Sequence, residues 1–495
     1  MRSNSIADID YCALQQCAAI STVSSKVVEG GAFFAVRGDR QHGNMFINEA
    51  INRGSTMLVT DELQSLNIDH AVLSKNINYF YHPQLTVLHP FIINKFWIKK
   101  LSLQSQAEVI AVTGTNGKST IVTLLEQLLP KCKSIGTLSG SGLTTPDVGT
   151  LQQWSAQYHL SGVAYIALEV SSHALTQRRV DALRITSAHF TNITHDHLDY
   201  HKTFENYRDS KFSLFIEYNL HHATICITDE ISKSLVCTTN ARKITCVFDS
   251  DSVFDLPDYA QGIRVGLFQA TLKGLSFWFE FLDRDKQISK RYTTTIIPFY
   301  GVHSLRNLGS VISELQFRNI GHDEILTLIN SVLPVPGRMQ LFLFPNVRHV
   351  FVDYAHTPDA MTQTLQALTL HGASQIICLF GCGGNRDVEK RPRMGKIAEE
   401  KSSLVILTND NPREEDPLTI IKNIQKGMKN PEAAKIIFDR GEAILYGIKM
   451  LTPGGVLLIA GKGHEQVQES NNKKAYWDDI AFVSSLLTEE SCNGL

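Results

Sequence analysis

The residues best suited to chemistry gather in residues 109–120, which read VIAVTGTNGKST. Gly114 and Gly117 would let backbone N–H groups approach an anion, and a helix that starts there would add the positive end of its dipole. Lys118 can reach the β- and γ-phosphates of a nucleotide, and Ser119 or the threonine after it can ligate Mg²⁺. The stretch therefore predicts a phosphate-binding loop. The alternative is an ordinary strand–turn–helix with a surface lysine.

The elements that must position this loop can be recognised on both sides of it. The apolar residues 109–112 predict a short buried strand. Apolar side chains then recur at helical spacing, at Ile121, Leu124, Leu125 and Leu128. The stretch departs from the full GxxxxGK[ST] form, because Val112 stands where the first glycine would be.

Side chains farther along the sequence could hold a metal. Glu169 ends an apolar strand, and a carboxylate facing a phosphate loop is a good hard ligand for Mg²⁺. Imidazoles and carboxylates are dense just after residue 190, at His195, Asp196, His197, Asp199 and His201. Their spacing alone leaves open a zinc site or a group of solvated and capping residues. Lys211, in YRDSKFSLF, is on its own typical of a solvated lysine on a helix.

Composition and charge exclude several classes of function. The chain has 495 residues, of which 43% are hydrophobic and 19% charged, as expected for a soluble globular protein of more than one domain. The net charge of −2 does not indicate a basic surface that would bind nucleic acid or an anionic membrane. No signal peptide is expected, and the apolar run at residues 87–97 is too short to span a bilayer. The nine scattered cysteines suit a reducing cytoplasm, and Cys378 and Cys382 are expected to be buried thiols rather than a metal pair.

Alternating strand and helix patterns predict an α/β protein with three domains. Residues 1–105 resemble a small α/β domain whose strands read GAFFAVRG, STMLVTD and AVLSK. Residues 106–334 alternate strands with helices, as in βαβ units on a parallel sheet, with an antiparallel flap expected at 263–298. Residues 335–495 form a third, Rossmann-like α/β unit. Ligands bind beyond the carboxyl ends of parallel strands, so the polar clusters that end its strands should line one crevice.

Together with TGTNGKST, further motifs make the chain similar to the Mur ligase family over nearly its whole length. These motifs are TTPD (144–147), EVSSHAL (169–175), TNITHDHLDYH (191–201), VPGRM (335–339), VDYAHTPDA (352–360), GCGGNRD (381–387), TNDNPREEDP (408–417) and GKGHE (461–465). The resemblance implies three α/β domains with a central P-loop-type parallel sheet. It implies that the first holds a UDP group, the second ATP and the third an incoming amino acid.

The resemblance also implies an activity. It is that of an ATP-dependent amide ligase that adds meso-2,6-diaminopimelate to UDP-N-acetylmuramoyl-L-alanyl-D-glutamate through an acyl-phosphate, in cytoplasmic peptidoglycan precursor synthesis. ATP and Mg²⁺ are implied, with small-molecule substrates, no nucleic acid, no membrane insertion and a monomeric chain. The alternatives are a lysine-adding ligase, a folylpolyglutamate synthase-like ligase and an inactive ATP-binding protein. TNDNPREEDP with GKGHE favours the first activity.

Individual residues take their expected roles from the same resemblance. The implied catalytic residues are Lys118, Glu169, His197 and Lys211. Those implied for ATP are Thr113, Gly114, Thr115, Asn116, Gly117, Lys118, Ser119, Thr120, Asn307 and Arg338, with Asp353, Tyr354 and His356 at a strand end that meets the nucleotide. Those implied for Mg²⁺ are Ser119, Glu169, His197 and Lys211, with Lys211 carbamylated to N6-carboxylysine and Asn192 and Asp196 in support. Those implied for the UDP-muramoyl-dipeptide are Ser24, Thr144, Thr145, Ser171, Gln177 and Arg179. Those implied for diaminopimelate are Arg386, Asp410, Asn411, Pro412, Arg413, Gly461 and Glu465.

Diaminopimelate and lysine differ by one carboxylate, so a cation must tell them apart. Arg413 supplies a bidentate fork for that carboxylate, and lysine-adding relatives generally lack it. Asp410 and Glu465 can take the distal ammonium. The alternative is that Arg413 pairs with Glu414 or Glu415 on the surface.

The sequence departs from the family pattern at three places. Val23, Ser24 and Ser25 stand where an Asp-Ser-Arg-like triplet is usual near the uracil, so only Ser24 matches. His303 and Ser304 replace an aromatic residue and an asparagine before Asn307, and Asn385 replaces an aspartate.

Overall fold

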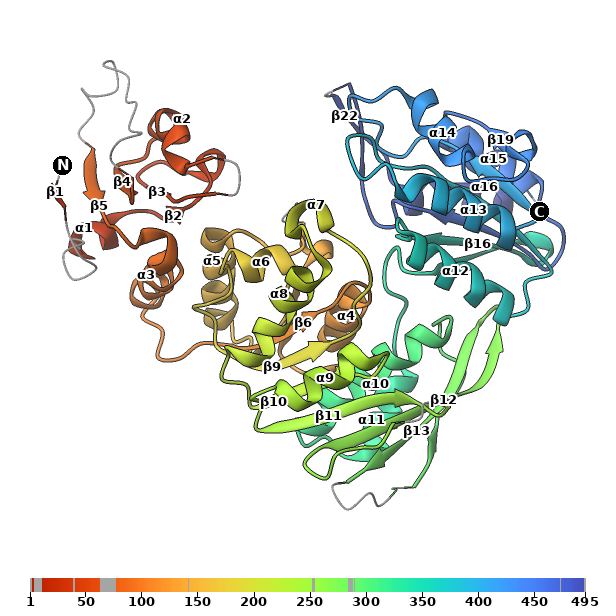
Figure 1. Cartoon of the computed structure of the whole chain (residues 1–495), viewed down its shortest axis with the longest axis horizontal. Coiled ribbons are helices and arrows are strands. Elements are labelled where there is room, and N and C mark those ends of the chain that lie inside the picture. Colours follow the sequence, from red (N-terminus) through yellow and green to blue (C-terminus); the bar gives the residue numbers. More distant parts are fainter. Residues whose placement is uncertain are drawn as a thin grey trace.

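In the residues that the structure describes, the strands form three large sheets and one small hairpin. The computed structural model describes residues 2–3, 11–38, 41–62, 77–140, 142–251, 254–283, 288, 290–471 and 473–493. Figure 1 shows three bodies in a row, with the N-terminal one in red and the C-terminal one in blue. The predicted three-domain α/β fold is confirmed. The boundaries near residues 105 and 334 stay a proposal. They are supported by the chain order of the strands, because each boundary lies between the last strand of one sheet and the first strand of the next.

The first sheet has five parallel strands in the order β1-β5-β4-β3-β2. Its elements are β1 (Arg2–Ser3), α1 (Tyr11–Gln16), β2 (Ile20–Ser21), η1 (Ser24–Lys26), β3 (Ala32–Ala35), η2 (Gly43–Phe46), α2 (Ile47–Asn52), β4 (Met57–Thr60), β5 (Asn78–Tyr81) and α3 (Leu85–Lys100). The strands expected at GAFFAVRG and STMLVTD are confirmed as β3 and β4. The one expected at AVLSK lies outside the described residues.

The central sheet has nine strands in the order β14-β13-β12-β11-β10-β9-β6-β8-β7. Its strands are β6 (Glu108–Thr113), β7 (Cys132–Ile135), β8 (Tyr165–Glu169), β9 (Ile185–Phe190), β10 (His222–Cys226), β11 (Lys243–Asp249), β12 (Gln261–Thr271), β13 (Gly274–Leu282) and β14 (Tyr292–Thr293). Its helices are α4 (Lys118–Leu128), η3 (Thr137–Ser139), α5 (Val148–Leu160), α6 (Ser172–Thr176), α7 (Leu198–His201), α8 (Phe204–Ile216), α9 (Glu230–Thr238), α10 (Val302–Phe317) and α11 (His322–Asn330).

The antiparallel strands expected at residues 263–298 are confirmed, but they do not form a separate flap. β12 pairs in parallel with β11 and antiparallel with β13, so the hairpin continues the central sheet. Figure 1 shows the long hairpin reaching towards α12 of the third domain. There His371 Nδ1 donates to Thr271 O at 2.6 Å, while His371 Nε2 accepts from Gly301 N at 3.1 Å. The hairpin thus fixes one point of contact between the two domains.

The third sheet has six strands in the order β15-β16-β20-β17-β18-β19, with β15 antiparallel and the others parallel. Its strands are β15 (Gln340–Phe344), β16 (Arg348–Asp353), β17 (Gln375–Phe380), β18 (Leu404–Leu407), β19 (Lys435–Ile436) and β20 (Gly455–Ala460), and β21 (Val467–Ser470) pairs with β22 (Lys473–Tyr476). Its helices are η4 (Pro345–Val347), α12 (Pro358–Leu370), α13 (Lys390–Lys401), α14 (Pro417–Gln425), η5 (Pro431–Ala433), α15 (Arg440–Lys449) and α16 (Asp479–Asn493).

The apolar patterns of the sequence account for the cores that hold these layers. The four apolar residues 109–112 of β6, the strand before the phosphate loop, are fully buried. Ile121, Leu124 and Leu125 of α4 are fully buried too. Burial of such side chains contributes about 1.5–3 kcal/mol each. Cys378 and Cys382 are buried in the third core, as expected for thiols. In the part of the chain that the structure describes, no helix is both long enough and apolar enough to cross a membrane.

Candidate active site

The predicted phosphate loop connects β6 to α4, and two glycines shape it. Gly117 has φ +90°, and a Cβ there would come within 2.5 Å of Asn307 Oδ1. Gly114 has φ +145°, and a Cβ there would overlap Thr191 Oγ1. Both residues must be glycine, because the backbone conformation is left-handed and the neighbours approach closely. The same contact puts Asn307, from α10, against the loop.

Asn192, two residues after the end of the neighbouring strand β9, holds the loop. Its backbone O accepts from Thr115 N at 2.9 Å, and its Oδ1 accepts from Asn116 N at 3.0 Å. Its Nδ2 donates to Asn116 O at 3.2 Å. The side-chain amide is therefore engaged with the loop backbone, and its support of a metal site would be indirect.

Two lysines, the partly buried Lys118 and the buried Lys211, converge on one carbonyl of the loop. Lys118 Nζ and Lys211 Nζ each donate to Gly114 O at 2.9 Å, and Lys118 also donates to Thr115 O at 2.9 Å. Lys211 reaches this point from α8 with only 2% of its surface exposed. Burial lowers the pKa of both amines, and the charge of Lys118 lowers the pKa of Lys211 further.

Glu169 and His197 lie on the same side of the loop. Glu169 ends β8, is 1% exposed, and its Oε1 accepts from Thr137 N at 2.9 Å. His197 has φ +54°, a strained conformation for this residue, and its Nε2 lies 3.5 Å from Asp196 Oδ2. Both residues line one cavity with Lys118 and Ser119, whereas Lys211 lies behind the loop.

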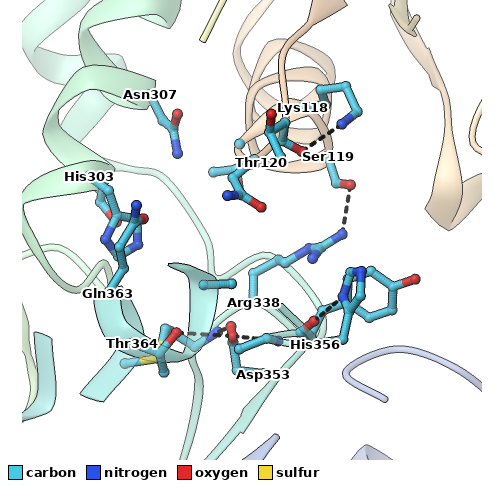
Figure 2. A pocket seen from close by; sticks show the side chains of 18 of the residues that line it. Lys118, Ser119, Thr120, His303, Asn307, Arg338, Asp353, His356, Gln363 and Thr364 are labelled. Atoms are coloured by element: carbon cyan, nitrogen blue, oxygen red, sulfur yellow. Dashed lines mark hydrogen bonds between the residues drawn. The ribbon is translucent and has the colours of Figure 1, made fainter. Parts of the chain in front are cut away.

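This cavity of about 250 Å³ lies between the central and third domains. Figure 2 shows Arg338 reaching across it, with its Nη2 donating to Ser119 Oγ at 2.8 Å. The guanidinium carbon lies 4.5 Å from the centre of the Tyr354 ring. Asp353 Oδ2 accepts from the backbone N of Met339 at 2.7 Å and so fixes the start of β15 next to Arg338. Among the described residues, Arg338 Nε and Thr113 Oγ1 are buried without a partner, which suits an additional ligand at this place.

The departures before Asn307 lie at the far end of the same cavity. Both His303 and Ser304 line it, and Ser304 Oγ donates to Tyr300 O at 2.6 Å. Thr120 and His356 complete its wall, as Figure 2 shows. The residues implied for ATP are thereby brought together from both domains.

Four of the residues implied for the muramoyl-dipeptide form one hydrogen-bonded group beyond β8. Thr145 Oγ1 accepts from Ser171 N at 2.9 Å and donates to Glu169 O at 2.8 Å. Arg179 Nη1 donates to Thr145 O at 2.8 Å, and its Nε donates to Gln177 Oε1 at 2.8 Å. Arg179 is therefore part of this group. Thr144 lies one residue away and accepts from Thr137 Oγ1 at 3.4 Å.

Ser24 lies in the first domain, and its hydroxyl donates to Glu49 Oε2 at 2.7 Å. The sequence analysis missed its neighbour Lys26, which contacts Asp147 of TTPD at 2.6 Å. That ion pair brings η1 next to the group around Thr145. Asp147 also caps α5, because its Oδ1 accepts from Thr150 N at 3.1 Å.

In the third domain, the loops after β18 and β20 meet. Asn411 Nδ2 donates to Glu465 Oε2 at 3.0 Å. Gly461 has φ +110°, and a Cβ there would come within 2.6 Å of Asp410 Oδ2. Pro412 is buried beside them. The loops that would line the expected crevice are therefore in contact, and they carry the residues implied for diaminopimelate, whereas the crevice itself stays a prediction.

Arg413 does not make the surface pair that was the alternative for it. Its Nη1 donates to Gly384 O at 2.8 Å, and its Nε lies 3.3 Å from Glu469 Oε2 of β21. Glu415 pairs instead with the buried Arg391 at 2.6 Å. Arg386 follows the same glycine turn but is exposed. Sequence reasoning missed Glu469, which has no motif to mark it.

A glycine-rich loop with a buried lysine faces a second α/β domain across a polar cavity, and this arrangement defines a multidomain P-loop-type enzyme. Residues 112–312 match the Mur ligase middle domain, and residues 337–463 match the Mur ligase glutamate ligase domain. The chain belongs to the Mur ligase family and is a ligase.

Two relatives and one solved structure, all of similar length, carry the name UDP-N-acetylmuramoyl-L-alanyl-D-glutamate--2,6-diaminopimelate ligase. The protein of that name from Coxiella burnetii is 34% identical over an alignment 490 residues long, and the match covers 95% of this chain and 95% of its own. The one from Aquifex aeolicus is 34% identical and covers 97% of this chain and 96% of its own. A solved structure of that name superimposes with a TM-score of 0.63 at 28% identity, covering 96% of this chain and 95% of its own.

Proposed function

We propose that this protein joins meso-diaminopimelate to UDP-N-acetylmuramoyl-L-alanyl-D-glutamate with the cleavage of ATP to ADP and phosphate. One observation carries the proposal: a phosphate loop and a crevice with Arg413, Asn411 and Glu465 occur in one chain that matches ligases of this name along nearly its whole length. The lysine-adding alternative is disfavoured by Arg413, because lysine has no distal carboxylate for the guanidinium to bind.

The reaction balances in two steps. A carboxylate oxygen of the D-glutamate residue attacks the γ-phosphorus of ATP, the bond to the bridging oxygen breaks, and ADP leaves. The amine of diaminopimelate then attacks the carbonyl carbon of the acyl-phosphate, an amide forms, and phosphate leaves with loss of one proton from the amine. Such chemistry depends on positioning and on the neutralisation of charge. Lys118, at the end of the loop, and Arg338, from the third domain, are the cations placed for this.

The residues present fit Mg²⁺ only in combination with substrate oxygens. Ser119 Oγ and the Glu169 carboxylate are hard donors at the cavity wall, and His197 is an imidazole on the same wall. Among the described residues, no three His, Cys, Asp or Glu side chains group as a metal site, so phosphate oxygens would complete the shell. When bound there, Mg²⁺ would neutralise charge on the phosphates.

Lys211 fits this site only as a carbamate. A bare amine offers no hard oxygen, whereas CO₂ added to an uncharged amine gives an anion with two of them. The position of Lys211, buried behind the loop and next to Lys118, supports this modification, because an anion there would offset the neighbouring cation. The cytoplasmic location and the monomeric state stay predictions.

The test is phosphate release with ATP, UDP-muramoyl-L-alanyl-D-glutamate and a single amino acid, followed by mass analysis of the product. We expect a diaminopimelate-dependent rate and a product heavier by one diaminopimelate residue. Lysine at the same concentration should react about 10⁴-fold more slowly, because the site would be left with an unpaired polar group. Comparable rates with lysine would assign the lysine-adding activity instead, and no ligation with either amino acid would refute the proposal.

A further inference from the structure

Lys462, in GKGHE, is a fully buried lysine whose role no motif explains. It follows β20 and is 0% exposed. Lysines are almost never buried to this extent unless they are paired. The sequence analysis singled out the first glycine and the glutamate of this motif and passed over the lysine between them.

The hydrogen bonds of Lys462 account for all of its donors. Its Nζ donates to Val467 O at 2.7 Å, to Asn411 Oδ1 at 3.2 Å and to Glu465 Oε2 at 3.2 Å. An ammonium group has three N–H donors and no acceptor. Lys462 therefore has no donor left for a ligand, so any effect on substrate must act through the residues that it holds.

Two of those residues belong to the proposed diaminopimelate site. Asn411 Oδ1 also accepts from Glu469 N at 3.0 Å, and Asn411 Nδ2 donates to Glu465 Oε2 at 3.0 Å. The orientation of the amide is thus fixed, and one Nδ2 hydrogen stays available. In the described part of the chain, Glu465 Oε1 has no hydrogen-bond partner. The side chain of Glu465 is 35% exposed, so this oxygen can face a ligand.

The third contact ties the β21–β22 hairpin to the same point. Val467 begins β21, and Glu469 on that strand contacts Arg413 at 3.3 Å. Arg413 N also donates to Glu469 O at 3.0 Å. The ammonium group of Lys462 therefore connects Glu465, Asn411 and β21, the strand whose Glu469 contacts Arg413.

We propose that Lys462 is a positioning residue that sets selectivity for diaminopimelate, by holding Asn411, Glu465 and β21 in one arrangement. This inference rests on the proposed function. Its alternative is a buried ion pair that merely stabilises the third domain. The two roles predict different outcomes. A loss of stability should weaken the binding of all three substrates alike, whereas a loss of positioning should weaken the binding of the amino acid alone.

The experiment compares Lys462→Met, which keeps the length and apolar stem, with Lys462→Arg and with His349→Ala. His349 is 4% exposed and is the second residue of β16, near the amino end of a strand that pairs with β20, whereas Lys462 lies beyond the carboxyl end of β20, so the His349 variant controls for destabilisation of the domain. The full chain is used throughout. For each variant, Tm and the KM values for ATP, UDP-muramoyl-dipeptide and diaminopimelate are measured, together with the rate ratio of diaminopimelate to lysine.

For Lys462→Met we expect the KM for diaminopimelate to rise about 10- to 100-fold, because the carboxylate and amide lose a buried donor. The other two KM values should change less than about 2-fold, and the rate ratio should fall. Lys462→Arg should restore most of Tm but not the KM, because a planar fork cannot reproduce three diverging donors. His349→Ala should lower Tm without changing any KM.

Unchanged diaminopimelate kinetics in both Lys462 variants would overturn the inference, as would three KM values rising together. If Lys462→Met does not fold, Lys462→Arg decides alone, and a wild-type KM in it overturns the inference. Failure of the proposed function is seen separately, because the wild-type protein would then ligate no diaminopimelate. In that case both conclusions fall.

Discussion

The phosphate loop and the amino-acid crevice hold their cations in opposite ways. At the loop, Lys118 donates to two backbone carbonyls, and within the described residues it forms no ion pair. In the crevice, Lys462 contacts Glu465 and Arg413 contacts Glu469. The loop therefore has positive charge to offer a polyanion, whereas the crevice is already close to neutral and must recognise its ligand by geometry.

The difference also concerns how locally each region is encoded. The loop is made of consecutive residues between β6 and α4, and neighbours only brace it. The crevice takes residues from the ends of β17, β18 and β20 and from β21, which lie far apart in the sequence. A change at the loop should thus affect every reaction of the enzyme, and a change in the crevice only the choice of amino acid.

The largest effect is expected for Lys118→Ala. The rate with every amino acid should fall by at least about 10²- to 10³-fold, because a preorganised cation at the transferred phosphoryl group is lost. Phosphate release measures this rate. Lys133→Ala is the matched control, since Lys133 is an exposed lysine on β7 of the same domain. Wild-type turnover in Lys118→Ala would contradict the assignment of the loop.

Lys211→Ala should come next, with a loss of about 10- to 100-fold that is typical of removing a residue supporting a metal. Short carboxylic acids added to this variant should restore part of the rate, because they replace the oxygens of the carbamate. The same acids should leave Lys118→Ala unchanged, which makes that variant the control. Absence of rescue, together with a high-resolution map showing a bare amine beside bound metal, would refute the carbamate.

A change in the crevice should behave differently. Arg413→Ala is expected to lower the preference for diaminopimelate over lysine by about 100-fold or more, because the distal carboxylate loses its bidentate partner. Rates with both amino acids at equal concentration measure this preference. Arg393→Ala is the control, since Arg393 is an exposed arginine on α13 of the same domain and its loss should change the preference less than about 5-fold. An unchanged preference in Arg413→Ala would end the assignment.

The smallest effect is expected for Glu469→Gln. Its carboxylate is 32% exposed, so its pair with Arg413 should contribute less than about 1 kcal/mol. The KM for diaminopimelate should therefore change less than about 5-fold. A change as large as that of Arg413→Ala would show that the crevice depends on its charge balance, and the contrast with the loop would need revision.

The sequence by itself determined the elements whose signals are local. The apolar run and glycines of residues 109–120 specify a strand, a turn and a helix, and period-two alternation specified the β12–β13 hairpin. Motifs at strand ends also located the crevice, because parallel strands bring their carboxyl ends to one edge. The apolar segment KIIFD at residues 435–439 forms only the two-residue β19, because edge strands are fixed by pairing more than by pattern.

Only the tertiary structure decided how side chains distant in sequence share one partner. Nothing in YRDSKFSLF indicates that Lys211 meets the carbonyl of Gly114, 97 residues earlier. Nothing in GKGHE shows that its lysine donates hydrogen bonds to Asn411, Glu465 and Val467. Such contacts depend on where helices and strands cross, whereas local patterns report only which face of an element is buried. The sequence therefore determined the parts of this ligase, and packing decided which charges face one another.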